Sequence, residues 1–212
     1  LASSSTTHVK SAASPGVIEV TLLEPGVEPR QALRYELEEG QVEHSVMVMR
    51  MGLRQVMDGA WSEWLGMPPT EMAVTTTVID TYEDGSFLID VVFTDVRVPI
   101  DPGQLTPEAA EELEAQMASL VGLRQTMHMD PRGRILESTT IFPSGTDPAG
   151  MQASQLDAMT PEMVEPLPEE PVGVGAVWEV GRETSDAMGF PTYGTNTTTL
   201  TEVLADGRLH LE

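Results

Sequence analysis

The sequence has 212 residues, a length that suits one ordinary domain. It contains no cysteine, which excludes disulfides and thiolate metal sites. Its 34 acidic residues outnumber the 11 basic ones and give a formal net charge of -23, a field that repels nucleic acid and anionic lipid head groups. No apolar run approaches the roughly 18 residues that a membrane-spanning helix needs, so we predict no transmembrane segment.

The chain begins with a small, polar stretch, residues 1–16, whose composition is typical of a flexible tether. Such a stretch is left when an export signal is removed, links a surface protein to its anchor, or is simply a poorly ordered tail. The next run, "VIEVTLL" at 17–23, is strand-like and ends before Pro25 and Gly26. Because extended segments pair readily with open sheet edges, we predict an assembly arm there, formed by Val17, Ile18, Val20 and Leu22.

A methionine-rich strand is predicted within residues 32–57, which look extended apart from a break at 38–41, where Gly40 suits a turn or a bulge. Alternate side chains of a strand share a face. One face of this strand consists of Met47, Met49, Met51 and Leu53. Met127 and Met129 form a similar pair further along the chain.

Thioether faces have three interpretations: a copper(I) site, an adaptable cavity for acyl chains, or plain core. Neighbours on one strand face lie about 7 Å apart, too far for three of them to reach one ion unless another strand contributes. The four histidines, His8, His44, His128 and His210, are scattered. We therefore predict no metal and no cofactor, and we treat the methionines as a core face or the wall of an apolar cavity.

Residues 58–69 combine turn formers with two tryptophans and are predicted to form a loop. An aromatic loop of this kind either caps the end of a core or forms a contact surface. We predict an interaction loop made by Trp61, Trp64 and Leu65.

Two hairpins are predicted in the middle of the chain. The first joins 72–82 to 86–98 through a turn at Asp84 and Gly85, and the second joins 123–129 to 134–142 through "DPRG". One face of the first hairpin carries Phe87, Ile89, Val91 and Phe93.

A helix at 107–121 is predicted between the hairpins, with Thr106 as N-cap, Pro107 at the first helical position and Gly122 after its end. Its apolar stripe predicts packing on the sheet. That stripe consists of Ala109, Leu113, Met117, Leu120 and Val121.

The remainder of the chain is predicted to be looser and then strand-rich. Residues 143–171 contain two short helix starts, at Asp147-Pro148 and Thr160-Pro161, and strands follow from 172 onward, interrupted by "DAMGFPTYG" at 186–194. The chain ends at Glu212, only five residues after a last turn at Asp206-Gly207. A terminal strand this short suggests that the natural protein continues or that another chain completes the strand.

No catalytic motif is strong enough to identify a reaction, so we predict a protein that is not an enzyme. The nucleophile elbow Gly-x-Ser-x-Gly does not occur, and "GSF" and "PSG" look like turns. Paired carboxylates carry little information in so acidic a chain. The glycines of "GVGAVW" lack the following helix that dinucleotide binding needs.

Several phrases resemble an uncharacterised family of bacterial secreted or lipid-anchored envelope proteins. They include a "Y-x-x-x-x-G" phrase at Tyr35 and Gly40, and "P-x-x-P-V-x-V-G-x-x-W" from Pro168 to Trp178. The resemblance covers most of residues 31–212. It implies an exported, non-catalytic, β-rich protein, similar in fold to the half-open barrels that carry lipids or lipoproteins across the envelope. The absence of cysteine departs from the lipid-anchored members.

The sequence thus predicts a flexible arm at 1–16 and a single β-rich domain at 17–212. We expect a curved antiparallel sheet or open β-barrel of roughly eight to ten strands with one packed helix. Two functions follow: an assembly module of the periplasm, outer membrane or cell surface, with itself or other envelope proteins as partners, or a carrier of a lipid or other apolar ligand. The predicted apolar cavity or core face consists of Met47, Met49, Met51, Leu53, Phe87, Phe93, Met127 and Met129.

Overall fold

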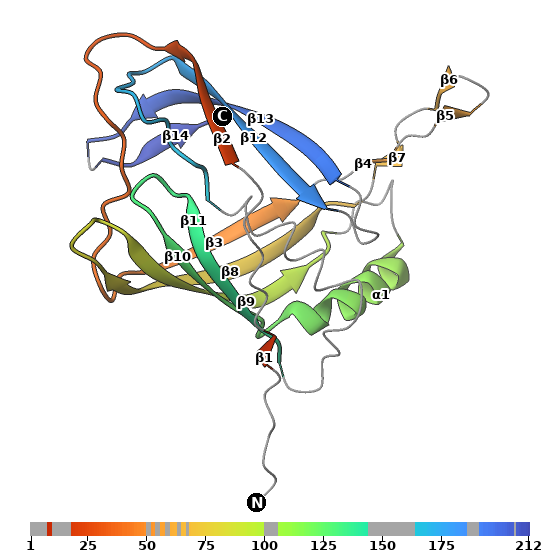
Figure 1. The fold of residues 1–212 in the computed structure, drawn as a ribbon. Helices are drawn as coiled ribbons and strands as arrows, with labels where there is room; N and C mark the ends of the chain where they lie inside the picture. Colours follow the sequence, from red (N-terminus) through yellow and green to blue (C-terminus); the bar gives the residue numbers. More distant parts are fainter. Residues whose placement is uncertain are drawn as a thin grey trace, which may run out of the picture.

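The computed structural model describes residues 8–9, 18–49, 52–53, 56–57, 60–62, 65–66, 68–99, 106–143, 164–185, 191–205 and 207–212. They form a mainly β protein with two antiparallel sheets and one short helix (Figure 1). The predicted fold class is confirmed. Nine of the described strands have three residues or more, which agrees with the predicted range.

The larger sheet, sheet A, has six strands in the order β1-β11-β10-β9-β8-β3. Each strand runs antiparallel to its neighbours. The strands are β1 (His8–Val9), β11 (Ile135–Ile141), β10 (Arg124–Met129), β9 (Phe87–Arg97), β8 (Thr70–Thr81) and β3 (Val42–Met49).

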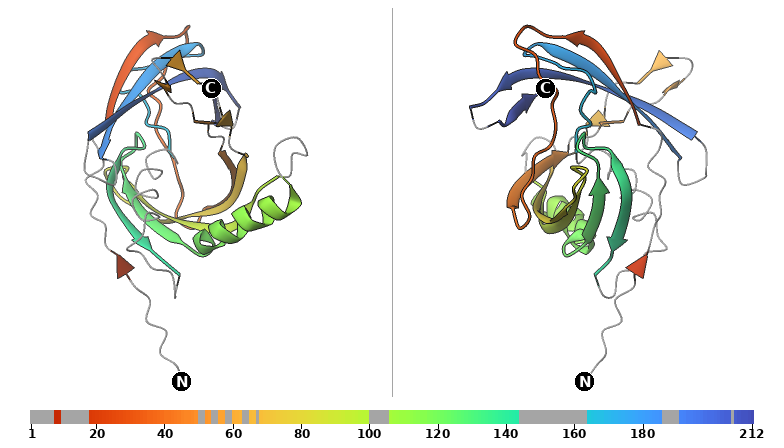
Figure 2. Two further views of the ribbon diagram at one scale, coloured as in Figure 1. Left: turned by 90° about the vertical axis from the view of Figure 1, so that its right-hand side faces the viewer. Right: turned by 60° about the vertical axis from the view of Figure 1, so that its left-hand side comes forward.

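The smaller sheet, sheet B, has the order β14-β13-β12-β2 and lies across sheet A (Figure 2). Its strands are β14 (Leu209–Leu211), β13 (Pro191–Val203), β12 (Ala176–Ser185) and β2 (Ile18–Pro25). Among the described residues no strand pairing joins the two sheets or links β3 to β1, so the sheets do not close into a barrel. Strands β2 and β3 are therefore edge strands.

Two short strand pairs follow β3. They are β4 (Gly52–Leu53) with β7 (Leu65–Gly66), and β5 (Val56–Met57) with β6 (Ala60–Trp61). The segment predicted as a tryptophan loop thus contributes the second strand of each pair.

Both predicted hairpins are confirmed. The backbone N–H of Gly85 donates to the Tyr82 carbonyl at 2.9 Å and closes the tight turn between β8 and β9. Gly85 has a φ of 80°, a conformation that glycine adopts without strain. The second turn, between β10 and β11, uses Gly133 with a φ of 79°. These turns fix the register that aligns the apolar faces of β8, β9 and β10.

The helix α1 (Pro107–Met117) continues into a 3-10 turn at Ala118–Leu120 and packs on sheet A through Met117 and Leu120. The backbone N–H of Val98 donates to the carboxylate of Glu114 at 2.7 Å, which ties the helix to the end of β9. The predicted stripe needs one correction. Ala110 is buried, whereas Val121 lies beyond the helix and is 39% exposed.

Two other sequence predictions were wrong. Residues 32–37 are not a strand but cross between the sheets: Gln31, just before them, pairs with Val172, and the Tyr35 N–H donates to Pro131 in the turn between β10 and β11. Strand β13 begins at Pro191, inside the predicted break at 186–194, because it continues the long pairing with β12. The predicted helix starts at 147–148 and 160–161 lie outside the described residues.

The interior has two apolar clusters that meet at Tyr35. One lies on sheet A around Phe93 and Met127, and the other on sheet B around Trp178 and Leu200. Tyr35 packs against both clusters. Within the described part of the chain, no helix is long and apolar enough to cross a membrane.

Candidate functional site

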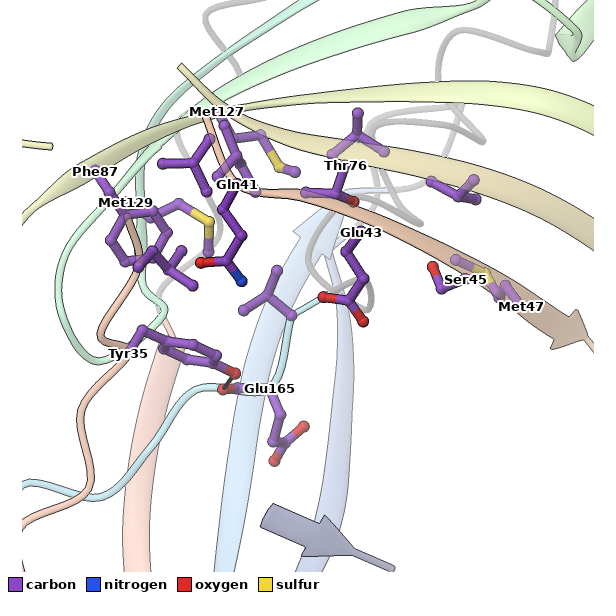
Figure 3. Close-up of a pocket in the computed structure, with 16 residues that line it drawn as sticks. Tyr35, Gln41, Glu43, Ser45, Met47, Thr76, Phe87, Met127, Met129 and Glu165 are labelled. Atoms are coloured by element: carbon purple, nitrogen blue, oxygen red, sulfur yellow. Dashed lines mark hydrogen bonds between the residues drawn. The ribbon is translucent and has the colours of Figure 1, made fainter. Parts of the chain in front are cut away.

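A cavity of about 260 Å³ lies on the face of sheet A that is turned toward sheet B (Figure 3). Sixteen residues line it, most of them apolar. The apolar wall includes Met47, Val78, Phe87, Ile89, Met127 and Met129. The polar lining residues are Tyr35, Gln41, Glu43, Ser45, Thr76 and Glu165.

The register of the strands explains why the wall changes from apolar to polar across the sheet. Val78 pairs with Ile89, and Ile89 pairs with Met127, so β8, β9 and β10 present one continuous apolar row. On the edge strand β3, Glu43 pairs with Thr76 of β8. The neighbouring row of side chains therefore ends in a carboxylate at the edge of the sheet. The cavity is therefore apolar toward β10 and polar toward β3.

Two segments without regular structure cover the cavity opposite β8 and β9. Tyr35 comes from the first, residues 32–37, and its hydroxyl donates to the backbone carbonyl of Glu165 in the second at 2.9 Å. The Glu165 carboxylate Oε1 accepts from Trp178 Nε1 at 3.2 Å and from Thr198 Oγ at 2.6 Å. These bonds connect the cover of the cavity to the buried face of sheet B.

The turn between β10 and β11 holds both covering segments. Pro131 accepts from Tyr35 N–H at 2.8 Å, and Arg132 accepts from Leu167 N–H at 2.9 Å. Gly133 lies directly under the cover: a Cβ there would stand 2.7 Å from the Tyr35 ring. The turn therefore needs glycine both for its backbone conformation and for the close approach of Tyr35.

Burial, and after it the negative charge of Glu165, raises the pKa of Tyr35 from 10.0 to about 12. Since the folded pKa exceeds the unfolded value, this group's contribution to stability is complete below pH 10 and is lost as the pH rises toward 12.

We predict that Tyr35→Phe lowers the free energy of unfolding by about 1 kcal/mol at pH 7, because the bond to the Glu165 carbonyl is lost. The difference from the parent protein should shrink between pH 10 and 12, since phenylalanine cannot ionise. Urea unfolding at stepped pH measures both effects. A gap that stays constant up to pH 12 would contradict the prediction.

A second polar group, on the opposite face of sheet A, contains aspartate, serine and histidine. Ser86 Oγ donates to Asp84 at 2.6 Å, and His128 Nε2 lies 3.1 Å from the same oxygen. Hydrogen bonds from Ser86 lower the pKa of Asp84. In a hydrolytic triad the histidine lies between serine and acid, whereas here the serine does. This arrangement stabilises the hairpin turn, as the sequence predicted for "GSF".

One cation faces the interior outside the cavity lining. Arg182 lies on the same face of β12 as Trp178 and Val180, which are both fully buried. Its Nε is buried and has no hydrogen-bond partner in the described part of the chain. In the same part, no group of three or more histidine or acidic side chains is placed to hold a metal ion.

The structure brings together half of the apolar residues predicted from the sequence. Met47, Phe87, Met127 and Met129 line the cavity, and Phe93 is fully buried in the same cluster without lining it. Met49 belongs to β3 and Leu53 to β4. Met51 lies outside the described residues.

The predicted arm and loop residues take other places. Ile18, Val20 and Leu22 belong to β2, which pairs with β12 of the same chain, so the predicted free arm is an edge strand of sheet B. Only its outer edge is open to assembly. Trp61 belongs to β6 and Leu65 to β7, whereas Val17 and Trp64 lie outside the described residues.

The sequence predictions missed the polar side of the cavity. Tyr35 and Trp178 belong to the phrases that carried the family resemblance, which was the one signal pointing to them. Glu43 and Glu165 had no signal, since neither differs by sequence from the many other glutamates of the chain. No protein family model, curated protein or solved structure matches this chain, so the resemblance to envelope proteins stays a prediction.

Proposed function

We propose that this protein binds a small apolar or amphipathic molecule in the cavity between its sheets and acts as a carrier in the cell envelope. The observation that supports this best is the convergence of Met47 from β3 and of Met127 and Met129 from β10 on one cavity. Methionine is flexible and polarizable, so such a wall adapts to ligands of irregular shape. A mostly apolar cavity with a few polar groups is the usual form of a small-molecule site.

The size of the cavity restricts the ligand. At about 260 Å³ it lies just below the range of about 300–1,000 Å³ that is common for small-molecule sites. It has the volume of about nine liquid water molecules at roughly 30 Å³ each, and a methylene group is of similar size. The cavity therefore suits a single short chain or a small ring system, and a two-chain lipid would leave most of its length outside.

Blocking the cavity tests the proposal. Thr76 lines the cavity from the middle of β8, and its neighbour Thr77 faces the other side of the sheet. We expect Thr76→Trp to weaken binding of the neutral dye N-phenyl-1-naphthylamine at least about tenfold, a loss of about 1.4 kcal/mol. Thr77→Trp, the matched control, should leave binding within about twofold. Dye fluorescence titration measures both.

Organic extraction of the protein from its native cells, followed by mass spectrometry, provides the independent check. A single-chain amphiphile that co-purifies with the parent protein and is absent from Thr76→Trp would support the proposal. If the parent binds no dye and yields no ligand, the carrier function is wrong.

The open sheet edges favour assembly as a second candidate function. Strand β3 ends sheet A, and its outward side chains Val42, Val46 and Val48 are 53%, 62% and 42% exposed. Unpaired backbone groups beside exposed valines form a template for another strand. Light scattering of the parent and of Val46→Lys distinguishes the cases. A larger species that the lysine dissociates would support assembly, and a monomer in both would count against it.

A further inference from the structure

We propose that Arg182 binds an oxyanion, the carboxylate or phosphate group of a small molecule, on the inner face of sheet B. The site consists of Arg182 on β12 together with Gly194 and Asn196 on the neighbouring strand β13 (Figure 1). None of the three residues lines the cavity between the sheets, so this proposal does not depend on the carrier function. Its basis is a cation without a partner in a strongly acidic protein.

Arg182 differs in its bonding from most other arginines that the structure describes. Five of them form ion pairs: Arg30 with Glu28, Arg97 with Asp95, Arg124 with Asp90, Arg132 with Glu169 and Arg134 with Asp130. Arg34 donates to three backbone carbonyls. Arg182 forms none of these ion pairs, and its Nε has no hydrogen-bond partner in the described part of the chain, although the sequence has 34 acidic residues.

A buried donor without a partner is unfavourable, because it has lost its hydrogen bonds to water and gained none in return. Arg182 is half-buried, and its Nε is buried. A guanidinium group remains charged at every physiological pH, so it cannot escape this cost by losing its proton. An oxyanion would remove the cost, since the five N–H donors of a guanidinium form a planar fork that fits carboxylate and phosphate oxygens.

A glycine on the neighbouring strand provides space beside this arginine. Arg182 pairs with Gly194, and directly opposite residues of antiparallel strands share a face. Gly194 is exposed, and a Cβ at this position would have no atom within 4 Å. The surface over Gly194 is therefore open, and a ligand can approach Arg182 from the side of β13.

Asn196 adds a second group of donors on the same face. It pairs with Val180, two residues before Arg182, and so lies diagonally across from Arg182. Such diagonal neighbours are about 7–8 Å apart, within reach of a long side chain. Asn196 is exposed, whereas Val180 is fully buried, so the face passes from interior to solvent here. An oxyanion at this border would accept from the guanidinium and from the amide.

The nearest carboxylates of β2 and β12 project from the opposite face of sheet B. Glu19 pairs with Gly181, the residue before Arg182, and therefore projects from that other face. Glu179 directly precedes Val180 and projects from the other face as well. Physiological salt screens charges beyond about 8 Å, so the local arrangement has more influence on a bound anion than the net charge of the chain.

Calorimetric titration of the full-length protein with inorganic phosphate, decyl phosphate and decanol tests the proposal. Sodium chloride keeps the ionic strength constant, because any salt screens a protein of this charge. We expect both phosphates to bind the parent protein. Arg182→Met should weaken both at least about tenfold and leave the affinity for decanol unchanged. Arg182→Lys should weaken them less, because lysine keeps the charge without the planar fork.

Arg97→Met is the matched control, since it removes the same charge from another strand. The Arg97 side chain is 73% exposed and pairs with Asp95 at 2.8 Å. Its loss should change the affinity for either phosphate less than about twofold. Equal losses in Arg182→Met and Arg97→Met would mean that binding follows net charge alone and would overturn the proposal. A parent protein that binds neither phosphate would overturn it as well.

Urea unfolding distinguishes a ligand-binding arginine from a structural one. Without ligand, the midpoint of Arg182→Met should equal or exceed that of the parent, because methionine replaces an unpaired polar group with an apolar one. Phosphate should raise the midpoint of the parent and leave that of the variant unchanged. A lower midpoint for the variant, with no effect of phosphate on either protein, would assign Arg182 a structural role and reject the site.

The two phosphates also identify the source of the anion. Similar affinities would support a site for a free anion. Tighter binding of decyl phosphate, with displacement of N-phenyl-1-naphthylamine, would support a site for the head group of an amphiphile whose tail enters the cavity. Dye binding itself should be the same in Arg182→Met as in the parent. Failure of the oxyanion site therefore leaves the carrier function standing, and a parent that binds phosphate but no dye retains only the oxyanion site.

Discussion

Gly173→Ala is expected to lower the free energy of unfolding by about 3 kcal/mol or more. A Cβ at this position would stand 1.8 Å from the carbonyl oxygen of Val27, and backbone cannot move aside as a side chain can. The same glycine accepts a hydrogen bond from Ala176 N–H and donates one to the Pro25 carbonyl. The substitution therefore displaces the junction at which β2 joins β12.

Gly181→Ala is the matched control for this prediction. Gly181 also belongs to β12, yet a Cβ there would have only ordinary contacts, the nearest at 3.8 Å from the Glu19 carbonyl oxygen. We expect the free energy of unfolding of Gly181→Ala to stay within about 0.5 kcal/mol of the parent value. Urea unfolding monitored by tryptophan fluorescence compares the two variants with the parent. Equal midpoints for the two variants would show that the junction at Gly173 relaxes without cost.

Asp130→Ala is expected to have the second large effect, a loss of about 3 kcal/mol, since hydrogen bonds to a charged group contribute about 1.5–3 kcal/mol each when one partner is removed. Asp130 is 9% exposed. One of its oxygens accepts from the N–H groups of Arg132 and Arg134, both at 2.9 Å, and the other accepts from the Arg134 guanidinium at 2.6 Å.

The same turn holds both segments that cover the cavity, so the effect should extend to ligand binding. Asp130→Ala should weaken dye binding as well as stability, because Pro131 and Arg132 position Tyr35 and Leu167. Asp84→Ala alters the exposed aspartate in the tip of the other hairpin and should cost much less, with dye binding retained. If the two variants lose the same stability and keep the same affinity, the turn at Asp130 does not organise the cover.

The elements that sequence analysis predicted best are those with a strict two-residue period and a glycine turn. Strands β8 and β9 alternate over most of their length and join at Asp84-Gly85, so their pairing and their apolar face follow from local pattern. Met47 of β3 and Met127 and Met129 of β10 were placed on one apolar face for the same reason, and all three line the cavity. Their meeting in one cavity depends on the curvature of the sheet, which no local pattern encodes.

The covering segments were beyond sequence analysis for a different reason. Residues 32–37 and 164–167 have no regular period, because their backbone bonds go to the turn between β10 and β11, from Tyr35 to Pro131 and from Leu167 to Arg132. A segment whose hydrogen bonds all go to residues distant in the sequence has no local pattern that tells a strand from a loop. Residues 164–167 contribute Glu165 to the polar lining of the cavity. Because their position could not be predicted, the sequence indicated only the apolar part of the site.

The exposed valines on the edge strand β3 bear on how the protein behaves as a colloid. Protein molecules with an exposed, apolar strand edge stay in solution only while electrostatic repulsion keeps these edges from pairing. Here the net charge of -23 supplies that repulsion. That repulsion fades in concentrated salt and near the isoelectric point of about 4.3. We therefore expect the acidity of the chain to keep apart molecules whose β3 edge has no partner strand among the described residues.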